Sequence, residues 1–284
     1  MSKTNPPKSV ASRKGAPAKV ISITSGKGGV GKTHTSVNLG LALTRLGKRV
    51  LLLDGDLGLA NINIMLGFQP SLTLAEVMAG RASLREVIVS HPLGFDVIPA
   101  SSGIPEMTLL SEAERLSLVE SFDELASQYD YMLVDTAAGI GDNVLYFNVA
   151  AEQILVVIGP EPTSITDAYA LIKVLAQRSG RREFDVVVNR APTGSDGRST
   201  FAQLAMATDR FLNVRLTFLG AVAEDESVRQ AVVRQTPFLE LFPTSKASRD
   251  ITRLAKKISE NEGSRVPKGG LQFFFRALLE GTDG

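Results

Sequence analysis

The sequence predicts an α/β fold: a mostly parallel, twisted sheet with helices on both of its faces. Short apolar runs alternate with longer stretches of helical periodicity from Val20 onward. These runs are apolar at nearly every position, as strands buried on both faces should be. Polar and glycine-rich motifs follow these runs. In parallel sheets, ligands bind at this place, beyond the carboxyl ends of the strands. With 284 residues, 44% of them hydrophobic, the chain can also bury a sizeable core.

The elements are expected to alternate as strand and helix, which right-handed crossovers fold into a layered domain. Strands are predicted over Val20–Thr24, Val50–Asp54, Phe95–Ile98, Tyr131–Asp135, Ile154–Ile158, Asp185–Asn189 and Leu216–Leu219. Helices are predicted over Lys32–Leu46, Glu112–Ser127, Ser164–Arg178, Thr200–Phe211 and Ser227–Arg234. The sequence contains no internal repeat and no linker that divides this core. One domain over residues 20–262 is therefore expected.

Residues 1–19 precede this domain and differ from it in composition. They hold five basic residues, three prolines and no acidic residue. Such a composition predicts a disordered basic tail, or a solvated leader with no specific partner. Residues 263–284 form a separate C-terminal segment.

The composition argues against several classes of function. The formal net charge is +1, so no direct nucleic-acid binding is expected. Cysteine is absent, which excludes disulfides, thiolate catalysis, zinc–thiolate sites and iron–sulfur clusters. Apolar runs such as Ile154–Ile158 are far shorter than the ~20 residues of a membrane-spanning helix. No apolar secretory stretch opens the chain. A cytoplasmic protein is the expectation.

A phosphate-binding loop lies between the first predicted strand and the first predicted helix. Residues 26–33 read Gly-Lys-Gly-Gly-Val-Gly-Lys-Thr, the pattern in which glycines let backbone N–H groups close on phosphate oxygens. Lys32 is expected to reach the β- and γ-phosphates, and Thr33 to bind Mg²⁺. The candidate contacts for ATP or ADP are Gly26, Lys27, Gly28, Gly29, Val30, Gly31, Lys32, Thr33 and His34. The His34 side chain itself is expected to face solvent.

Carboxylates follow two of the other predicted strands. Asp135 lies at the end of one apolar strand. A carboxylate in this position beside a phosphate loop usually supports Mg²⁺ indirectly, by holding the groups that bind the metal. Asp54 and Asp56 close another. Asp56 is the better candidate to orient the attacking water and to lie near the metal, with a helix cap or turn as the alternative role. That alternative carries more weight for Asp54.

The second lysine of the loop needs a separate explanation. Because Lys32 belongs to the loop's own grip on phosphate, Lys27 is expected to contact the nucleotide of a second subunit. The loop resembles that of the deviant Walker A ATPases of the MinD/ParA family, which reads Lys-Gly-Gly-x-Gly-Lys-[Ser/Thr]. The resemblance runs from about Val20 to the carboxyl terminus. It implies a single-domain P-loop NTPase and an ATP-dependent homodimer.

The same resemblance assigns further residues. It makes Lys27 the lysine that acts across the dimer, Asp56 the carboxylate that positions water, and Asn61 its neighbour in the first switch region. Residues 135–141 correspond to the second switch. The positions that correspond to adenine contacts are Asn189, Arg190 and Glu224. Ala223 departs from the family, which commonly has proline there.

Within this family, the chain looks closest to the flagellar branch, the FlhG-type proteins. The segments that carry this likeness are Asp54–Gly67, Asp135–Val144, Glu161–Lys173 and Pro243–Ser248. The resemblance implies a slow ATPase switch that regulates the number or placement of flagella. Its implied partners are a flagellar transcription activator, a signal-recognition-type partner GTPase or basal-body components. The alternatives are a MinD-like ATPase for cell division or cargo positioning, and an ATP-dependent adaptor that does not hydrolyse ATP.

The C-terminal segment predicts an amphipathic helix over residues 270–280. Five apolar side chains recur at helical spacing on one face: Leu271, Phe274, Phe275, Leu278 and Leu279. This face can lie in a membrane interface or dock on the domain's own core, and the sequence leaves both open. If an ATP-dependent dimer releases two such helices, the two together bind a membrane more tightly than one. Peripheral attachment to the inner face of the cytoplasmic membrane would then depend on ATP.

Overall fold

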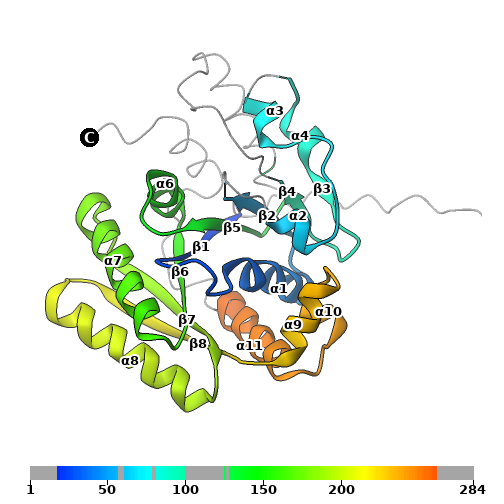
Figure 1. The fold of residues 1–284 in the computed structure, drawn as a ribbon. Helices are drawn as coiled ribbons and strands as arrows, with labels where there is room; N and C mark the ends of the chain where they lie inside the picture. The colour runs from blue at the N-terminus through cyan, green and yellow to red at the C-terminus, as the bar shows by residue number, and fades with distance from the viewer. Residues whose placement is uncertain (1–17, 57–60, 79–80, 100–124, 126–127, 261–284) are drawn as a thin grey trace, which may run out of the picture.

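A central sheet organises the fold, which is taken from a computed structural model (Figure 1). The structure describes residues 18–56, 61–78, 81–99, 125 and 128–260. Over these residues the strands form an eight-stranded sheet in the order β3-β4-β2-β5-β1-β6-β7-β8. Every pair is parallel except β3 with β4 at one edge. The mostly parallel α/β architecture expected from the sequence is confirmed.

The strands and helices have the following bounds. The strands are β1 Lys19–Ser25, β2 Val50–Gly55, β3 Val89–Ser90, β4 Asp96–Ile98, β5 Tyr131–Ala138, β6 Gln153–Ile158, β7 Glu183–Ala191 and β8 Arg215–Ala223. The helices are α1 Lys32–Arg45, α2 Ile62–Met65, α3 Leu74–Met78, α4 Leu84–Val87, α6 Asp142–Ala150, α7 Pro162–Ser179, α8 Gly194–Phe211, α9 Glu226–Val233, α10 Phe238–Leu241 and α11 Lys246–Glu260.

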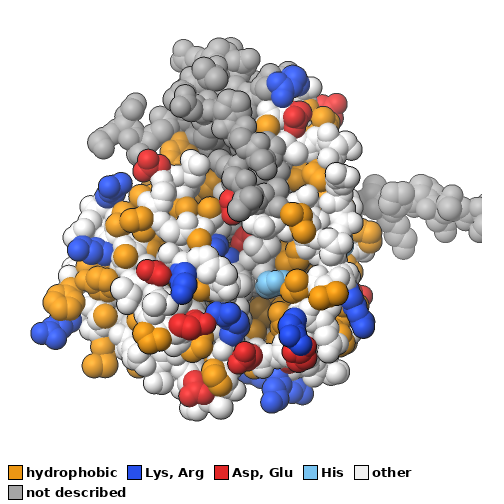
Figure 2. All heavy atoms as spheres, viewed as in Figure 1, with side chains coloured by type: hydrophobic (Ala, Val, Ile, Leu, Met, Phe, Trp, Pro, Cys, Tyr) orange, Lys and Arg blue, Asp and Glu red, His pale blue; other side chains and the backbone are white. Residues whose placement is uncertain are grey.

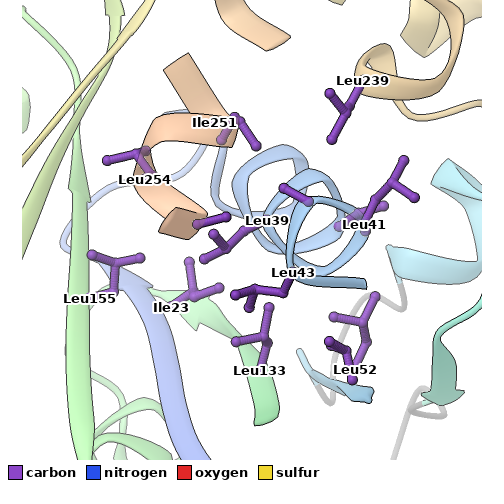
Figure 3. Close-up of a cluster of buried hydrophobic side chains, with 14 of the residues drawn as sticks. Ile23, Leu39, Leu41, Leu43, Leu52, Leu133, Leu155, Leu239, Ile251 and Leu254 are labelled. Carbon is purple, nitrogen blue, oxygen red and sulfur yellow. The ribbon is translucent and has the colours of Figure 1, made fainter. Parts of the chain in front are cut away.

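Helices cover both faces of the sheet (Figure 1). On one face, α1, α10 and α11 pack over the strands, and their side chains converge with strand residues in one apolar cluster (Figure 3). Leu39 on α1, Leu254 on α11 and Leu155 on β6 belong to it. On the other face, α6, α7 and α8 pack against β6 and β7 in a second cluster. The helix α1, which carries the phosphate loop, is therefore fixed between the sheet and α11.

Several predicted boundaries change. β1 begins at Lys19, which pairs with Tyr131, so this residue does not belong to the predicted tail. The helix predicted to begin at Thr200 begins at Gly194, because Thr193 accepts a hydrogen bond from the N–H of Asp196 and caps it earlier. The elements that were not predicted at all are β3, α6, α11 and the short helices α2, α3, α4 and α10. For α11 a signal was present: Ala247, Ile251, Leu254, Ala255 and Ile258 recur at helical spacing and are buried.

Other predictions fall outside the described residues. These are the basic tail over residues 1–17, nearly all of the helix predicted over Glu112–Ser127, and the amphipathic helix over residues 270–280. Among the described residues, no helix is both long enough and apolar enough to cross a membrane. On the face shown in Figure 2, acidic and basic side chains are interspersed rather than separated.

A buried polar cluster ties β1 to α6, the helix that follows the second switch region. Ser22 Oγ donates a hydrogen bond to Asn148 Oδ1 at 2.8 Å. Asn148 Nδ2 donates to Thr24 Oγ1 at 3.1 Å and to the carbonyl of Val144 at 2.7 Å. All three side chains are buried. Asn148 therefore satisfies two hydroxyl groups that water cannot reach.

We expect Asn148→Leu to lower the free energy of unfolding by about 3 kcal/mol, because two buried hydroxyls lose their partner. Urea denaturation measures this change. Gln203→Leu is the matched control, since it replaces an exposed amide on α8 and should change stability by less than ~0.5 kcal/mol. Equal stabilities of the two variants would show that the cluster is unimportant.

Candidate functional site

The phosphate loop joins the carboxyl end of β1 to the start of α1. Gly29 and Gly31 adopt positive φ angles of 75° and 92°, which glycine tolerates without strain. No atom of the described residues lies within 4 Å of a Cβ atom built on Gly28 or Gly29, so these residues leave the outer side of the loop open. Lys27, Gly28 and Gly29 are exposed. A ligand can therefore approach the backbone N–H groups of this segment, as the sequence predicts.

The inner side of the loop is packed tightly against α7 and β7. A Cβ atom on Gly26 would lie 2.1 Å from the backbone oxygen of Asp167 on α7. A Cβ atom on Gly31 would lie 2.2 Å from Nδ2 of Asn189, at the end of β7. The same Asn189 Nδ2 donates a hydrogen bond to the carbonyl of Val30 at 2.7 Å. Two elements far away in the sequence thus fix the shape of the loop.

Lys32 and Asp135 lie below the loop and are largely buried. Burial lowers the pKa of Lys32, and the charges of Asp135 and Asp56 oppose this shift. Burial raises the pKa of Asp135 to about 7, although hydrogen bonds from Thr33 and Ser36 favour the ionised form. Thr33 thus stands beside the carboxylate that the sequence assigned to the metal. This arrangement fits a threonine that binds Mg²⁺ and an aspartate that supports it from behind.

Ser36 was not predicted as part of the site. Its Oγ donates to Asp135 Oδ1 at 2.9 Å and to the carbonyl of Lys32 at 3.0 Å. The signal that could have identified it is its spacing. Residue 36 lies three positions after Thr33, and therefore on the same face of α1.

Asp54 and Asp56 have different surroundings. Asp54 is buried, and its carboxylate accepts hydrogen bonds from the backbone N–H groups of Asn61 at 2.9 Å and Ile62 at 3.1 Å. Burial raises its pKa to about 6. Asp54 therefore holds the start of α2, the capping role that the sequence left open. Asp56 is half-buried, and its Oδ2 accepts from Asn61 Nδ2 at 3.4 Å.

Lys27 lies apart from this buried group. Its side chain is exposed and its Nζ donates a hydrogen bond to Thr163 Oγ1 at 2.9 Å. Thr163 belongs to the first turn of α7. Ser25 Oγ donates to the carbonyl of Lys27 at 2.6 Å, which shapes the backbone at this position. Lys32 therefore lies beneath the loop, whereas Lys27 lies on its outer surface beside α7.

The remaining candidate residues occupy the ends of β7 and β8. Arg190 has a positive φ of 56° and forms an ion pair with Glu161 at 2.6 Å. Glu224 is exposed, and its N–H donates to the carbonyl of Ala191 at 3.0 Å. With Asn189 they lie at the same edge of the sheet as the loop. An adenine contact by these side chains stays a prediction.

His34 is only partly exposed. Its side chain is half-buried rather than directed fully into solvent, and burial lowers its pKa. The cause is the packing of α1, whose residues from Thr35 to Leu43 are buried where the helix packs against the sheet and α11.

Comparisons with known proteins agree with this geometry. Residues 18–185 match the family model described as an AAA domain. Antiactivator FleN of Pseudomonas aeruginosa is 48% identical over 264 residues, which cover 93% of this chain and 94% of that protein. Flagellum site-determining protein YlxH of Helicobacter pylori is 34% identical, with coverage of 96% and 94%.

A solved structure shows the same fold. It is the septum site-determining protein MinD of Pyrococcus horikoshii complexed with Mg-ADP, which is 25% identical with a TM-score of 0.67. The match covers 87% of this chain and 98% of that one. The sheet order, the phosphate loop between β1 and α1, and these relatives agree on one group of proteins. The chain belongs to the MinD/ParA family of P-loop ATPases, in the group that includes FleN.

Proposed function

We propose that the protein is an ATPase switch that dimerises with ATP and regulates the number or placement of flagella. The observation that carries this proposal is the pair of lysines in the phosphate loop. Lys32 is largely buried below the loop, whereas Lys27 is exposed and bonded to Thr163. Each subunit therefore has two lysines in its loop. Lys32 is placed to bind the subunit's own phosphates, and we infer that Lys27, at the edge of the site, is not needed for this binding.

ATP with Mg²⁺ is the proposed ligand. The open glycines of the loop and the buried Lys32 fit a triphosphate, and the MinD relative was solved with Mg-ADP. Thr33 would bind the metal, with Asp135 held behind it. The described residues contain no group of three acidic, histidine or cysteine side chains that could hold a metal ion without the nucleotide. Bound Mg²⁺ would neutralise charge on the phosphate oxygens.

Dimerisation would complete the site. In the proposed dimer, Lys27 leaves Thr163 and places its ammonium group at the γ-phosphate in the other subunit. A positive charge supplied across an interface stabilises the negative charge that develops on the transferred phosphoryl group. Asp56, beside Asn61, would orient the attacking water. Hydrolysis would then remove the γ-phosphate that joins the subunits and separate them.

The flagellar role is proposed from the relatives. One is named an antiactivator and another a flagellum site-determining protein. By this likeness we propose that the dimer acts on a flagellar transcription activator, a signal-recognition-type GTPase or basal-body components. It would work in the cytoplasm and attach reversibly to the inner face of the membrane.

Replacing Lys27 tests the contact between subunits. We expect Lys27→Ala to weaken ATP-dependent dimers by about 100-fold, the usual scale for losing one charge of a buried pair across an interface. Binding of ATP to the monomer should stay largely unchanged, because Lys32 and the loop are intact. Sedimentation velocity and fluorescent-nucleotide titration measure the two properties. Lys173→Ala is the control, since this lysine is exposed elsewhere on α7. Dimers of normal affinity in Lys27→Ala would refute the contact.

Replacing Asp56 tests the hydrolytic step. We expect Asp56→Ala to lower kcat by roughly 100-fold, as for loss of a group that activates water. Its dimers should persist in ATP, because turnover no longer separates them. Phosphate release and light scattering follow the two effects, with Asp209→Ala on the exposed side of α8 as control. Rapid turnover by Asp56→Ala would remove Asp56 from its proposed role.

Replacing two phenylalanines tests the membrane proposal. We expect Phe274→Glu with Phe275→Glu to abolish ATP-dependent binding to anionic vesicles, because each charge is costly in the interface. Vesicle sedimentation with an ATP analogue and with ADP measures this. Phe211→Glu is the control, since Phe211 is 65% exposed on α8 and lies outside the segment. If the double variant sediments with vesicles as the wild type does, the segment is not the membrane anchor.

A further inference from the structure

The helix α2 is too short to be stable on its own. It spans four residues, Ile62–Met65, whereas isolated helices need about 12–15 residues to form in water. Contacts with the rest of the domain must therefore hold it: Ile62 is buried in the core, and hydrogen bonds are made at both ends of the helix. At its start, Asp54 accepts the N–H groups of Asn61 and Ile62. Asn61 in turn donates to Asp56, the proposed water-positioning residue. The position of α2 therefore affects the position of Asp56.

The other end of α2 faces the end of α9, and both ends have the same geometry. After α2, Gly67 has a φ of 66°, and the N–H of Phe68 donates to the carbonyl of Asn63. After α9, Gln235 has a φ of 47°, and the N–H of Thr236 donates to the carbonyl of Ala231. Both are Schellman caps, in which the left-handed residue is usually glycine.

Glutamine is an unfavourable residue at this position. Among the described residues, Gln235 and Arg190 are the non-glycine residues with a positive φ. The left-handed conformation strains any residue that has a Cβ atom. The glutamine side chain does, however, make a contact that glycine could not. Its Nε2 donates to the carbonyl of Ile64, on α2, at 2.9 Å.

The two caps are also in direct contact. A Cβ atom built on Gly67 would lie 3.4 Å from Cβ of Gln235. The end of α9 therefore abuts the end of α2, and the Gln235 amide adds a hydrogen bond across the contact. α9 is itself fixed, because Asp225 caps its start and also accepts the N–H of Ala247 on α11. Gln235 thus links α2 to a rigid part of the domain.

We propose that Gln235 is a positioning residue for hydrolysis, which acts through α2 to hold Asn61 and Asp56 in place. Gln235 has this role only if the protein hydrolyses ATP through Asp56, as proposed above. Residues that strain the backbone persist where the strain serves function, and here the strained residue supplies the amide.

The test separates activity from stability in the full-length protein. Gln235→Gly relieves the backbone strain but removes the amide, so the unfolding temperature should stay within about 2 °C of the wild type. Its kcat for ATP should fall roughly 10-fold, because the water-positioning group is less well held. Its KM should change little, since the phosphate loop is untouched. Gln235→Glu keeps the length and the strain without the donor and should lose kcat equally.

Gly47→Gln is the matched control. Gly47 ends α1 in a cap of the same kind, with a φ of 79° and, within the described parts of the chain, no atom within 4 Å of an added Cβ. This variant should lower the unfolding temperature by about 2–4 °C and keep the wild-type kcat. Gln235→Gly at wild-type kcat would overturn the proposal, as would a kcat loss in Gly47→Gln as large as that in Gln235→Gly.

Asp56→Ala, measured in parallel, tells the two proposals apart. If it turns over normally, or if the wild type releases no phosphate, the proposed hydrolysis fails and the role of Gln235 fails with it. If Asp56→Ala is inactive while Gln235→Gly is fully active, only the role of Gln235 fails.

Discussion

The buried charges below the phosphate loop are the constraint on which the site depends. Asp54 and Asp135 are paired in register on the neighbouring strands β2 and β5. Burial raises the pKa of Asp54 to about 6 and that of Asp135 to about 7, and it lowers the pKa of Lys32. Burial disfavours the charged form of each group, and the charge of Asp54 further disfavours ionisation of Asp135. The charges of Lys32 and Asp135 favour one another, and hydrogen bonds from nearby backbone and hydroxyl groups favour the ionised form of both carboxylates. A parallel sheet makes this possible, because it brings the ends of β1, β2 and β5 to one edge.

The two lysines of the loop lie in different surroundings, one largely buried below the loop and the other exposed on its outer surface. Lys32 belongs to the buried charge group, and the glycines around it leave room for phosphate. Lys27 is held on the outer surface by Thr163, on the helix whose backbone packs against Gly26. Loop and α7 therefore form one rigid unit, which would present Lys27 to a partner at a defined place. On the other side of the site, α2 is too short to be stable alone and is held by the burial of Ile62 and by hydrogen bonds to Asp54 and Gln235.

Much of the fold was predictable, because its signals are local. The central strands are continuous apolar runs, and the phosphate loop is a contiguous pattern between a strand and a helix. The place of Asp135 in a strand was predictable for the same reason, and its role at the metal stays a prediction. The contacts that complete the site could not be predicted, because they join distant parts of the chain. Gln235 and Ile64 are 171 residues apart, and Lys27 and Thr163 are 136 apart. The helix α11 was also predictable, because its buried residues recur at helical spacing in the sequence.

The mass of the wild-type protein in solution, measured by gel filtration with light scattering, is the most direct test of a site shared by two subunits. The 30.4 kDa chain should elute as a monomer with Mg²⁺ and ADP. With Mg²⁺ and a non-hydrolysable ATP analogue, it should elute at twice that mass, because the γ-phosphate gives Lys27 of each subunit its target in the other. A monomer in both nucleotides, at concentrations where the analogue is bound, would contradict the proposal that ATP joins two subunits.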